Sequence, residues 1–238
     1  MKRKVYIIIG HPHNDKQKDS FNIFSNYYRI FFYDTSGGAY ENEEIVILNQ
    51  PTVEILKNEI NRSKEDFGIV VLIGHGATKE NNQLFQINEN EIIKAGQLDF
   101  RFRKQIIILE SCRDEITNIQ TVDLSDKIPK FRDGGIYRKP ISRIKSKELY
   151  LEQLKKCENG LVICLACSRN ESAENFYYSS SLLQIGKNWH LNRENYSQIL
   201  KINELMFLTR IQVSNKTQNR QNPEMLGIKD FPFVISKF

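Results

Sequence analysis

The hydrophobic residues of this chain gather in five short, nearly continuous runs rich in β-branched side chains. A strand buried on both faces has this pattern, whereas a half-exposed strand alternates apolar and polar residues. The runs therefore predict the strands of one mainly parallel sheet, covered on both faces. They are Val5–Gly10, Glu44–Leu48, Gly68–Ile73, Lys104–Leu109 and Gly160–Leu165.

Between these runs, apolar residues recur at the spacing of a helix face. The marker residues are Phe21, Phe24, Tyr28 and Phe31; Val53, Leu56 and Ile60; Leu151 and Leu154; Phe176, Ser180 and Leu183; and Leu205, Leu208 and Gln212, the last group behind a capping Asn203. Alternating strands and helices predict an α/β sandwich with helices on both faces of the sheet. We expect a single domain, residues 1–238.

Composition narrows the class of protein. The 238 residues are 40% hydrophobic and carry a formal charge of +5. No run approaches the roughly 20 apolar residues of a membrane helix, and the short run behind Met1–Lys4 does not fit a signal peptide. The modest charge argues against a nucleic-acid partner. Cys112, Cys157, Cys164 and Cys167 are expected to be reduced, so we expect a cytoplasmic protein without a membrane partner.

The residues that follow the predicted strands carry the candidate chemistry, because ligands of such sheets bind at the carboxyl ends of the strands. His75 follows the third run and Cys112 follows the fourth. A cysteine attacks as a thiolate, and a nearby imidazole can take the thiol proton. The backbone N–H groups of Gly76 and Cys112 could bind an oxyanion. The other strand-end residues are His11 and His13 after the first run, and Ser168 and Arg169 after the fifth.

The stretches FGIVVLIGHGA and KQIIILESCRDE resemble the His-Gly and Cys motifs of the caspase/metacaspase cysteine peptidases. The likeness continues through GLVICLACSRNESAENF and FYYSSSLLQIGKN, and into the tail at Gln221–Pro223 and Phe231–Phe233. The resemblance implies a caspase-like three-layer sandwich and a cysteine endopeptidase. It implies His75 as general base, Cys112 as nucleophile, and Gly76 and Cys112 as oxyanion hole. It implies no cofactor.

An acid two residues before the cysteine, here Glu110, resembles the metacaspases that cleave after Arg or Lys. A pocket carboxylate favours a cationic side chain through charge-assisted hydrogen bonds. Asp15 is a candidate second pocket acid, and Ser168 and Arg169 are candidate substrate contacts. The alternative is that Glu110 pairs with Arg113 or Arg169. The scattered acids after His75 do not predict a calcium site.

A basic stretch between the fourth and fifth strands predicts a mobile loop at about residues 118–148. Glycines and Pro140 interrupt it, as is typical of an exposed loop. In an enzyme that cuts after basic residues this loop would be a candidate for self-cleavage. A plain solvated linker is the alternative.

Two other functions remain open from the sequence. His11, His13 and Asp15 could supply three ligands to a catalytic zinc. Lys16 and the lack of a second ligand cluster speak against it, and we favour these residues as a wall of the pocket. A caspase-like fold could also be an idle scaffold or signal-binding module. Stand-alone homologues imply activation by a partner or small signalling molecule in antiviral defence or cell death, with protein or peptide substrates.

Overall fold

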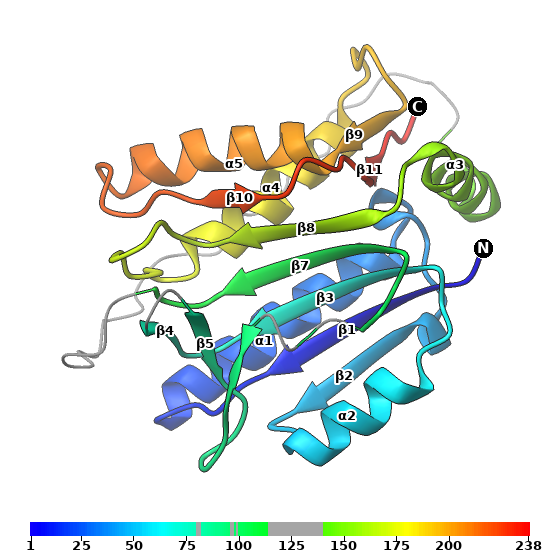
Figure 1. Cartoon of the computed structure of the whole chain (residues 1–238). Helices are drawn as coiled ribbons and strands as arrows, with labels where there is room; N and C mark the ends of the chain where they lie inside the picture. Colours follow the sequence, from blue (N-terminus) through cyan, green and yellow to red (C-terminus); the bar gives the residue numbers. More distant parts are fainter. Residues whose placement is uncertain (80–81, 96–97, 99, 114–139) are drawn as a thin grey trace.

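The computed structural model has a six-stranded sheet at its centre (Figure 1). It describes residues 1–79, 82–95, 98, 100–113 and 140–238. The strand order is β10-β8-β7-β3-β1-β2, and only β10 runs antiparallel to its neighbour. The strands are β1 (Arg3–Ile9), β2 (Ile45–Asn49), β3 (Phe67–Ile73), β7 (Lys104–Glu110), β8 (Gly160–Leu165) and β10 (Glu224–Leu226). The predicted mainly parallel sheet is confirmed.

Helices cover both faces of this sheet, as predicted (Figure 1). One face carries four helices, and α2 (Val53–Arg62) lies on the other. The four are α1 (Asp15–Tyr33), α3 (Arg143–Lys156), α4 (Tyr177–Leu191) and α5 (Ile202–Lys216). Successive side chains of a buried strand point to opposite faces, so each strand contributes to two cores. In β1, Ile7 belongs to the core under the four helices, whereas Tyr6 and Ile8 belong to the core that includes Leu56 of α2.

The second face is covered by more than a helix. A three-stranded sheet, β4 (Gly76–Lys79), β5 (Asn82–Gln86) and β6 (Ile92–Lys94), leaves the end of β3 and folds back over this core. The ring of Phe100 stacks on Tyr6 with centroids 4.4 Å apart. The small sheet places β5 against the ends of β1 and β3, and it therefore matters for the site described below.

A second small sheet pairs β9 (Ile199–Lys201) with β11 (Pro232–Ile235). Phe233, in the part of the tail that carries the resemblance, lies in β11, whereas β9 and β10 were not predicted. The short 3-10 helices η1 (Thr35–Gly37) and η2 (Asn42–Glu44) connect α1 to β2.

Two predictions about element ends were wrong. The helix α5 starts behind Lys201, and Asn203 lies inside its first turn, where its N–H donates to Asp230 Oδ1 at 3.2 Å. The cap is therefore supplied from a distant residue, which a local pattern does not reveal. The predicted loop at 118–148 ends earlier, because the Ser142 side chain caps α3 and the helix begins at Arg143. The part of this loop up to residue 139 lies outside the described residues.

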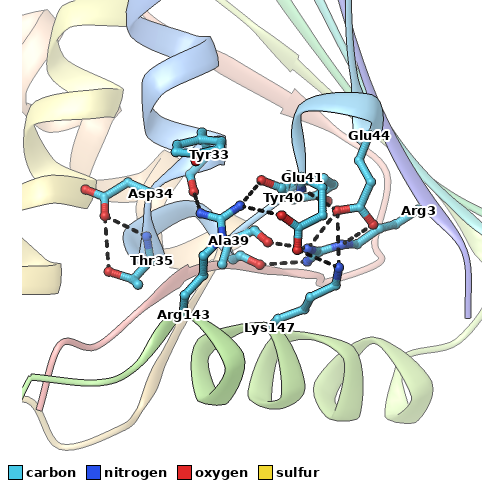
Figure 2. A network of polar contacts seen from close by, with 11 residues as sticks. Arg3, Tyr33, Asp34, Thr35, Ala39, Tyr40, Glu41, Glu44, Arg143 and Lys147 are labelled. Atoms are coloured by element: carbon cyan, nitrogen blue, oxygen red, sulfur yellow. Dashed lines mark hydrogen bonds and ion pairs between the residues drawn. The ribbon is translucent and has the colours of Figure 1, made fainter.

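At the amino end of the sheet, Arg3 is buried with a complete set of partners (Figure 2). Its guanidinium donates to the carbonyls of Gly38 and Ala39, both at 2.8 Å, and pairs with Glu44 at 3.2 Å. It also lies over the ring of Tyr40, 3.8 Å from the centroid. A buried charge is tolerated when it is paired and its donors are used, and this site meets both conditions.

The same network fixes the start of α3. Arg143 donates to the carbonyls of Tyr33 and Tyr40 and pairs with Glu41 at 3.0 Å (Figure 2). Lys147, one turn later, reaches Glu41 at 3.1 Å. The first two turns of α3 are therefore bound to the segment that follows α1.

Within the described part of the chain, no helix is long and apolar enough to cross a membrane.

Candidate active site at the carboxyl end of the sheet

His75 and Cys112 lie at the same edge of the sheet because of the register between β3 and β7. The two strands are parallel and Ile73 lies opposite Glu110. His75 and Cys112 each follow that pair by two residues. The Gly74 N–H continues the ladder by donating to the Glu110 carbonyl at 3.2 Å. The sequence-predicted placement of both residues at the carboxyl end of neighbouring strands is thus what the structure shows.

A glycine after the histidine lets the two strand exits approach closely. A Cβ atom at Gly76 would lie 2.7 Å from Ser111 Oγ and 2.8 Å from the Leu84 carbonyl oxygen. A side chain here would displace the Ser111 hydroxyl and would also clash with the β5 backbone within the same hairpin. Gly76, a predicted oxyanion-hole residue, is therefore packed against the residue before the cysteine.

The His75 ring is held from two sides. Its Nε2 atom lies 3.1 Å from Gln17 Oε1, near the start of α1. The ring of His13 stacks on it, with centroids 3.9 Å apart and planes 8° from parallel. The buried ring of Phe21 lies 5.8 Å from it. His13, predicted as part of the wall of the pocket, contacts the His75 ring directly.

These surroundings favour the neutral imidazole. Burial, together with the neighbouring His13 and His11, lowers the pKa of His75 to about 4. An imidazole with this pKa carries no charge at neutral pH, so it keeps a lone pair that can accept a proton.

The Cys112 thiol is half-buried and faces the loop after β8. Its Sγ atom accepts the Ala173 N–H at 3.4 Å, and its carbonyl accepts from Gln83 Nε2 at 3.1 Å. A hydrogen bond from a backbone N–H stabilises a thiolate more than a thiol, because it adds a donor to the charged form. The hairpin residue Gln83 and the loop residue Ala173 together define where the cysteine sits.

Arg113 was weighed only as a partner of Glu110, and it has a different role. Its guanidinium pairs with Glu224 of β10 at 2.6 Å and donates to the Cys167 carbonyl at 3.2 Å. It also donates to Gln83 Oε1 at 3.3 Å. The residue after the cysteine thus ties the exit of β7 to three other segments. No local motif marks this function, since all the partners are distant in sequence.

Glu110 is 4% exposed and points into the first turn of α4. Its Oε2 accepts the Ser179 N–H at 2.7 Å, and Ser179 Oγ bonds the Tyr28 hydroxyl at 2.9 Å. Burial raises the pKa of Glu110 to about 7. In this conformation the carboxyl group holds the start of a helix, where a negative charge is favoured.

The remaining predicted site residues surround this edge at different depths. Asp15 is exposed at the first position of α1, and His11 bonds Gln50 Oε1 through Nδ1 at 2.9 Å. Ser168 turns inward, with its hydroxyl donating to the Asn222 carbonyl at 2.9 Å. Arg169 is exposed. Ser168 therefore braces the loop, whereas Asp15 and Arg169 lie where a ligand could meet them.

An aromatic wall, formed by Phe21, Phe24 and Phe176, joins α1 to the start of α4. Phe176 stacks on Phe24 at 4.3 Å and meets Phe21 edge-on at 5.9 Å. Phe176 and the preceding Asn175 both adopt positive φ angles, 54° and 44°. Such angles are costly for residues other than glycine and tend to gather at functional sites. The wall was not predicted, because Phe176 was assigned only to a helix face.

The zinc alternative has no support in the described residues. Among them, no group of three or more His, Cys, Asp or Glu side chains could hold a metal ion. His11 and His13 instead bond the amide oxygens of Gln50 and Gln86.

Comparison with known proteins supports the fold. No family model matches the chain, and no curated protein matches its sequence. Among solved structures, caspase-1 from Spodoptera frugiperda is similar in fold, with a TM-score of 0.59 at 10% sequence identity. The match covers 99% of this chain and 92% of that chain. At so low an identity the likeness shows a caspase-like fold and leaves the chemistry to the residues.

Proposed function

We propose that this protein is a cysteine endopeptidase in which Cys112 is the nucleophile and His75 the general base and acid. One observation carries the proposal: the β3–β7 register brings a half-buried thiol and a neutral imidazole to one edge of the sheet. The caspase-like fold is consistent with protein or peptide substrates. The same edge is where open parallel sheets bind their ligands.

The reaction would run through an acyl-enzyme. The Cys112 sulfur attacks the scissile carbonyl carbon while its proton passes to His75, and the carbonyl oxygen becomes an oxyanion. The backbone N–H groups of Gly76 and Cys112 would bind that oxyanion. The peptide C–N bond then breaks as His75 returns the proton to the leaving amine. Water hydrolyses the thioester and regenerates the thiol.

We further propose cleavage after Arg or Lys, with Glu110 as the acid of the pocket. A carboxyl group whose pKa is about 7 is half-ionised at neutral pH. A cationic side chain would favour the charged form, so binding would release a proton. KM for an Arg substrate should therefore improve as the pH rises through 7, and KM for a neutral substrate should not.

A panel of fluorogenic peptides ending in Arg, Lys, Asp or a neutral residue tests both parts. Wild type should hydrolyse the basic peptides, and Cys112→Ala should abolish hydrolysis. Cys157→Ala is a matched control, because Cys157 is also half-buried but lies at the end of α3. Cleavage only after Asp would remove the role of Glu110 and leave the dyad intact.

Trapping by an electrophilic peptide separates an enzyme from an idle scaffold. An active site would be alkylated at Cys112 and not at Cys157. Alkylation without peptide hydrolysis would indicate an enzyme that needs the activating partner or signal inferred from the resemblance. No alkylation of Cys112 in the folded protein would favour the scaffold.

A further inference from the structure

We propose that Gln17 is a positioning residue that holds His75 in one tautomer, with the proton on Nε2 and the lone pair on Nδ1. The inference rests on the proposed function, because it names the nitrogen that would exchange a proton with Cys112. It goes further by assigning a role to a residue on α1 that no motif contains.

The argument begins with the orientation of the Gln17 amide. The oxygen and nitrogen of a glutamine amide look alike, so their assignment depends on the hydrogen-bond partners. The backbone N–H of His13 lies 2.8 Å from Gln17 Oε1. A backbone N–H can only donate, so the atom facing it must be the carbonyl oxygen. The amide orientation is therefore fixed without reference to His75.

The same oxygen then decides the tautomer of His75. Gln17 Oε1 lies 3.1 Å from His75 Nε2. Since a carbonyl oxygen can only accept, the Nε2 atom must carry a hydrogen. In a neutral imidazole only one ring nitrogen is protonated, so Nδ1 holds the lone pair. His75 has the lowered pKa that keeps the ring neutral at pH 7.

Local structure holds Gln17 in place for this task. Asn14 caps α1, and its Oδ1 accepts the Gln17 N–H at 2.9 Å. The Gln17 side chain then folds back over the cap to meet the His13 N–H. The two hydrogen bonds link Gln17 to both Asn14 and His13, so the amide oxygen is in position before a substrate binds.

The opposite side of the His75 ring is also fixed. His13 stacks on the ring and bonds Gln86 Oε1 through Nε2 at 3.2 Å. The Gln86 N–H in turn donates to the His75 carbonyl at 2.9 Å. The ring therefore cannot rotate freely about its bond to Cβ, and the choice of tautomer also fixes where the lone pair points.

An amide in this place has a different effect from a carboxylate. Both accept from Nε2–H, but a carboxylate would also favour the charged imidazolium. Burial, and then His13 and His11 from the β1–α1 segment, disfavour the charged form of His75. A neutral acceptor such as Gln17 therefore holds the Nε2 hydrogen without stabilising a charge on the ring.

The direct test is ¹⁵N NMR of the full chain labelled at histidine, where the chain's four histidines can be assigned with His75→Ala. Wild type should show His75 protonated at Nε2 alone. Gln17→Leu should show a mixture of tautomers and a fall in kcat/KM of about tenfold, the scale of one hydrogen bond. Gln17→Glu keeps the acceptor and should restore one tautomer, while moving the acid limb of kcat/KM upward by about one pH unit.

Gln50→Leu is the matched control, because Gln50 bonds His11 in the same way without touching His75. It should leave the His75 tautomer unchanged. A wild-type His75 protonated at Nδ1, or one Nε2–H tautomer that persists in Gln17→Leu, would overturn the inference. If Gln17→Leu does not fold, an unshifted acid limb in Gln17→Glu would overturn it. The NMR spectra can be recorded on an inactive protein. If His75 carries its proton on Nε2 but Cys112 is not alkylated, the proposed peptidase function is rejected and the role of Gln17 is not.

Discussion

The two ends of the central sheet use buried polar groups in opposite ways. At the amino end, Arg3 is 3% exposed and meets two carbonyls, Glu44 and the ring of Tyr40 (Figure 2). At the carboxyl end, His75 is surrounded by a neutral amide and other histidines. The first arrangement stabilises a charge, and the second disfavours one.

This difference distinguishes a structural site from a candidate active site. A buried cation with complementary partners is fixed in one charge state, so it can hold elements together but cannot exchange protons. A buried imidazole with a lowered pKa retains a free lone pair, which is what a general base requires. The sheet therefore has a rigid amino end and, under the proposed function, a reactive carboxyl end, so substitutions at the two ends should have different consequences.

The largest effect is expected from His75→Phe at the reactive end. The ring and its stacking on His13 are retained, but the base is lost, so kcat/KM should fall by about 10²- to 10⁴-fold. The free energy of unfolding should change by less than about 1.5 kcal/mol, as for a swap of similar volume. Peptide hydrolysis and urea unfolding measure the two quantities. A loss of stability large enough to explain the loss of activity would contradict the contrast between the ends.

Arg3→Met should show the reverse. The substitution leaves the buried carbonyls of Gly38 and Ala39 without their donor and removes the cation that pairs with Glu44, and breaking such a buried arrangement costs about 3–5 kcal/mol. At temperatures where the variant remains folded, the rate of Cys112 alkylation should match wild type. Lys2→Met, at the exposed neighbouring position, is the control and should cost little. A cost below about 1 kcal/mol for Arg3→Met would show that the network is not structural.

The next prediction compares two groups within the reactive end, which shift stability in opposite directions. The folded chain holds the pKa of His75 at about 4, below its ordinary 6.5, so stability is lost as the pH falls from 6.5 towards 4. It holds the pKa of Glu110 at about 7, above its ordinary 4.5, so stability is lost as the pH rises from 4.5 towards 7. Each effect is limited to about 3 kcal/mol. Between pH 4.5 and 6.5 they offset each other.

Single substitutions should expose each component. Glu110→Gln should lose stability towards acid more steeply than wild type, because the His75 component is no longer offset. His75→Phe should lose stability as the pH rises from 4.5 to 7, and the double variant should again follow wild type. Urea unfolding across this range measures the slopes. The other carboxyl groups are common to all four proteins, so identical slopes in the single variants would reject both shifts.

The sequence predicted the features that depend on neighbouring residues, and it did not predict contacts between residues that are distant along the chain. Continuous apolar runs predicted the five parallel strands, although β2 at the edge of the sheet is only partly buried and Ile47 is exposed. The strand ends then placed His75 and Cys112 at one edge. The partners that give these residues their properties, Gln17 and Gln83, lie on α1 and β5, and no periodicity marks a glutamine that folds back onto a histidine.

The errors have the same cause. Asn203 was predicted as a cap from its position before an apolar pattern, but Asp230 supplies that contact from the other end of a loop. The basic stretch before α3 suggested an exposed loop up to residue 148. The charges of Arg143 and Lys147 are instead used to bind the turn after α1. Charge alone does not distinguish a solvated residue from one with a distant partner.

The smallest effect is expected from substitutions in the outer part of the Arg3 network. Arg143→Ala removes the donor to the carbonyls of Tyr33 and Tyr40 and should cost about 1–2 kcal/mol. Glu41→Gln removes the charge that pairs with Arg143 and Lys147, and because the Glu41 side chain is 46% exposed it should cost less than about 1 kcal/mol. Lys145→Ala, at an exposed position on the same turn of α3, is the control. If Glu41→Gln cost as much as Arg143→Ala, the ion pair would hold the start of α3. If Glu41→Gln costs less, the hydrogen bonds from Arg143 to the two carbonyls hold the start of α3. The stability of the amino end should then depend little on salt and pH, whereas changes in pH act directly on His75 and Glu110.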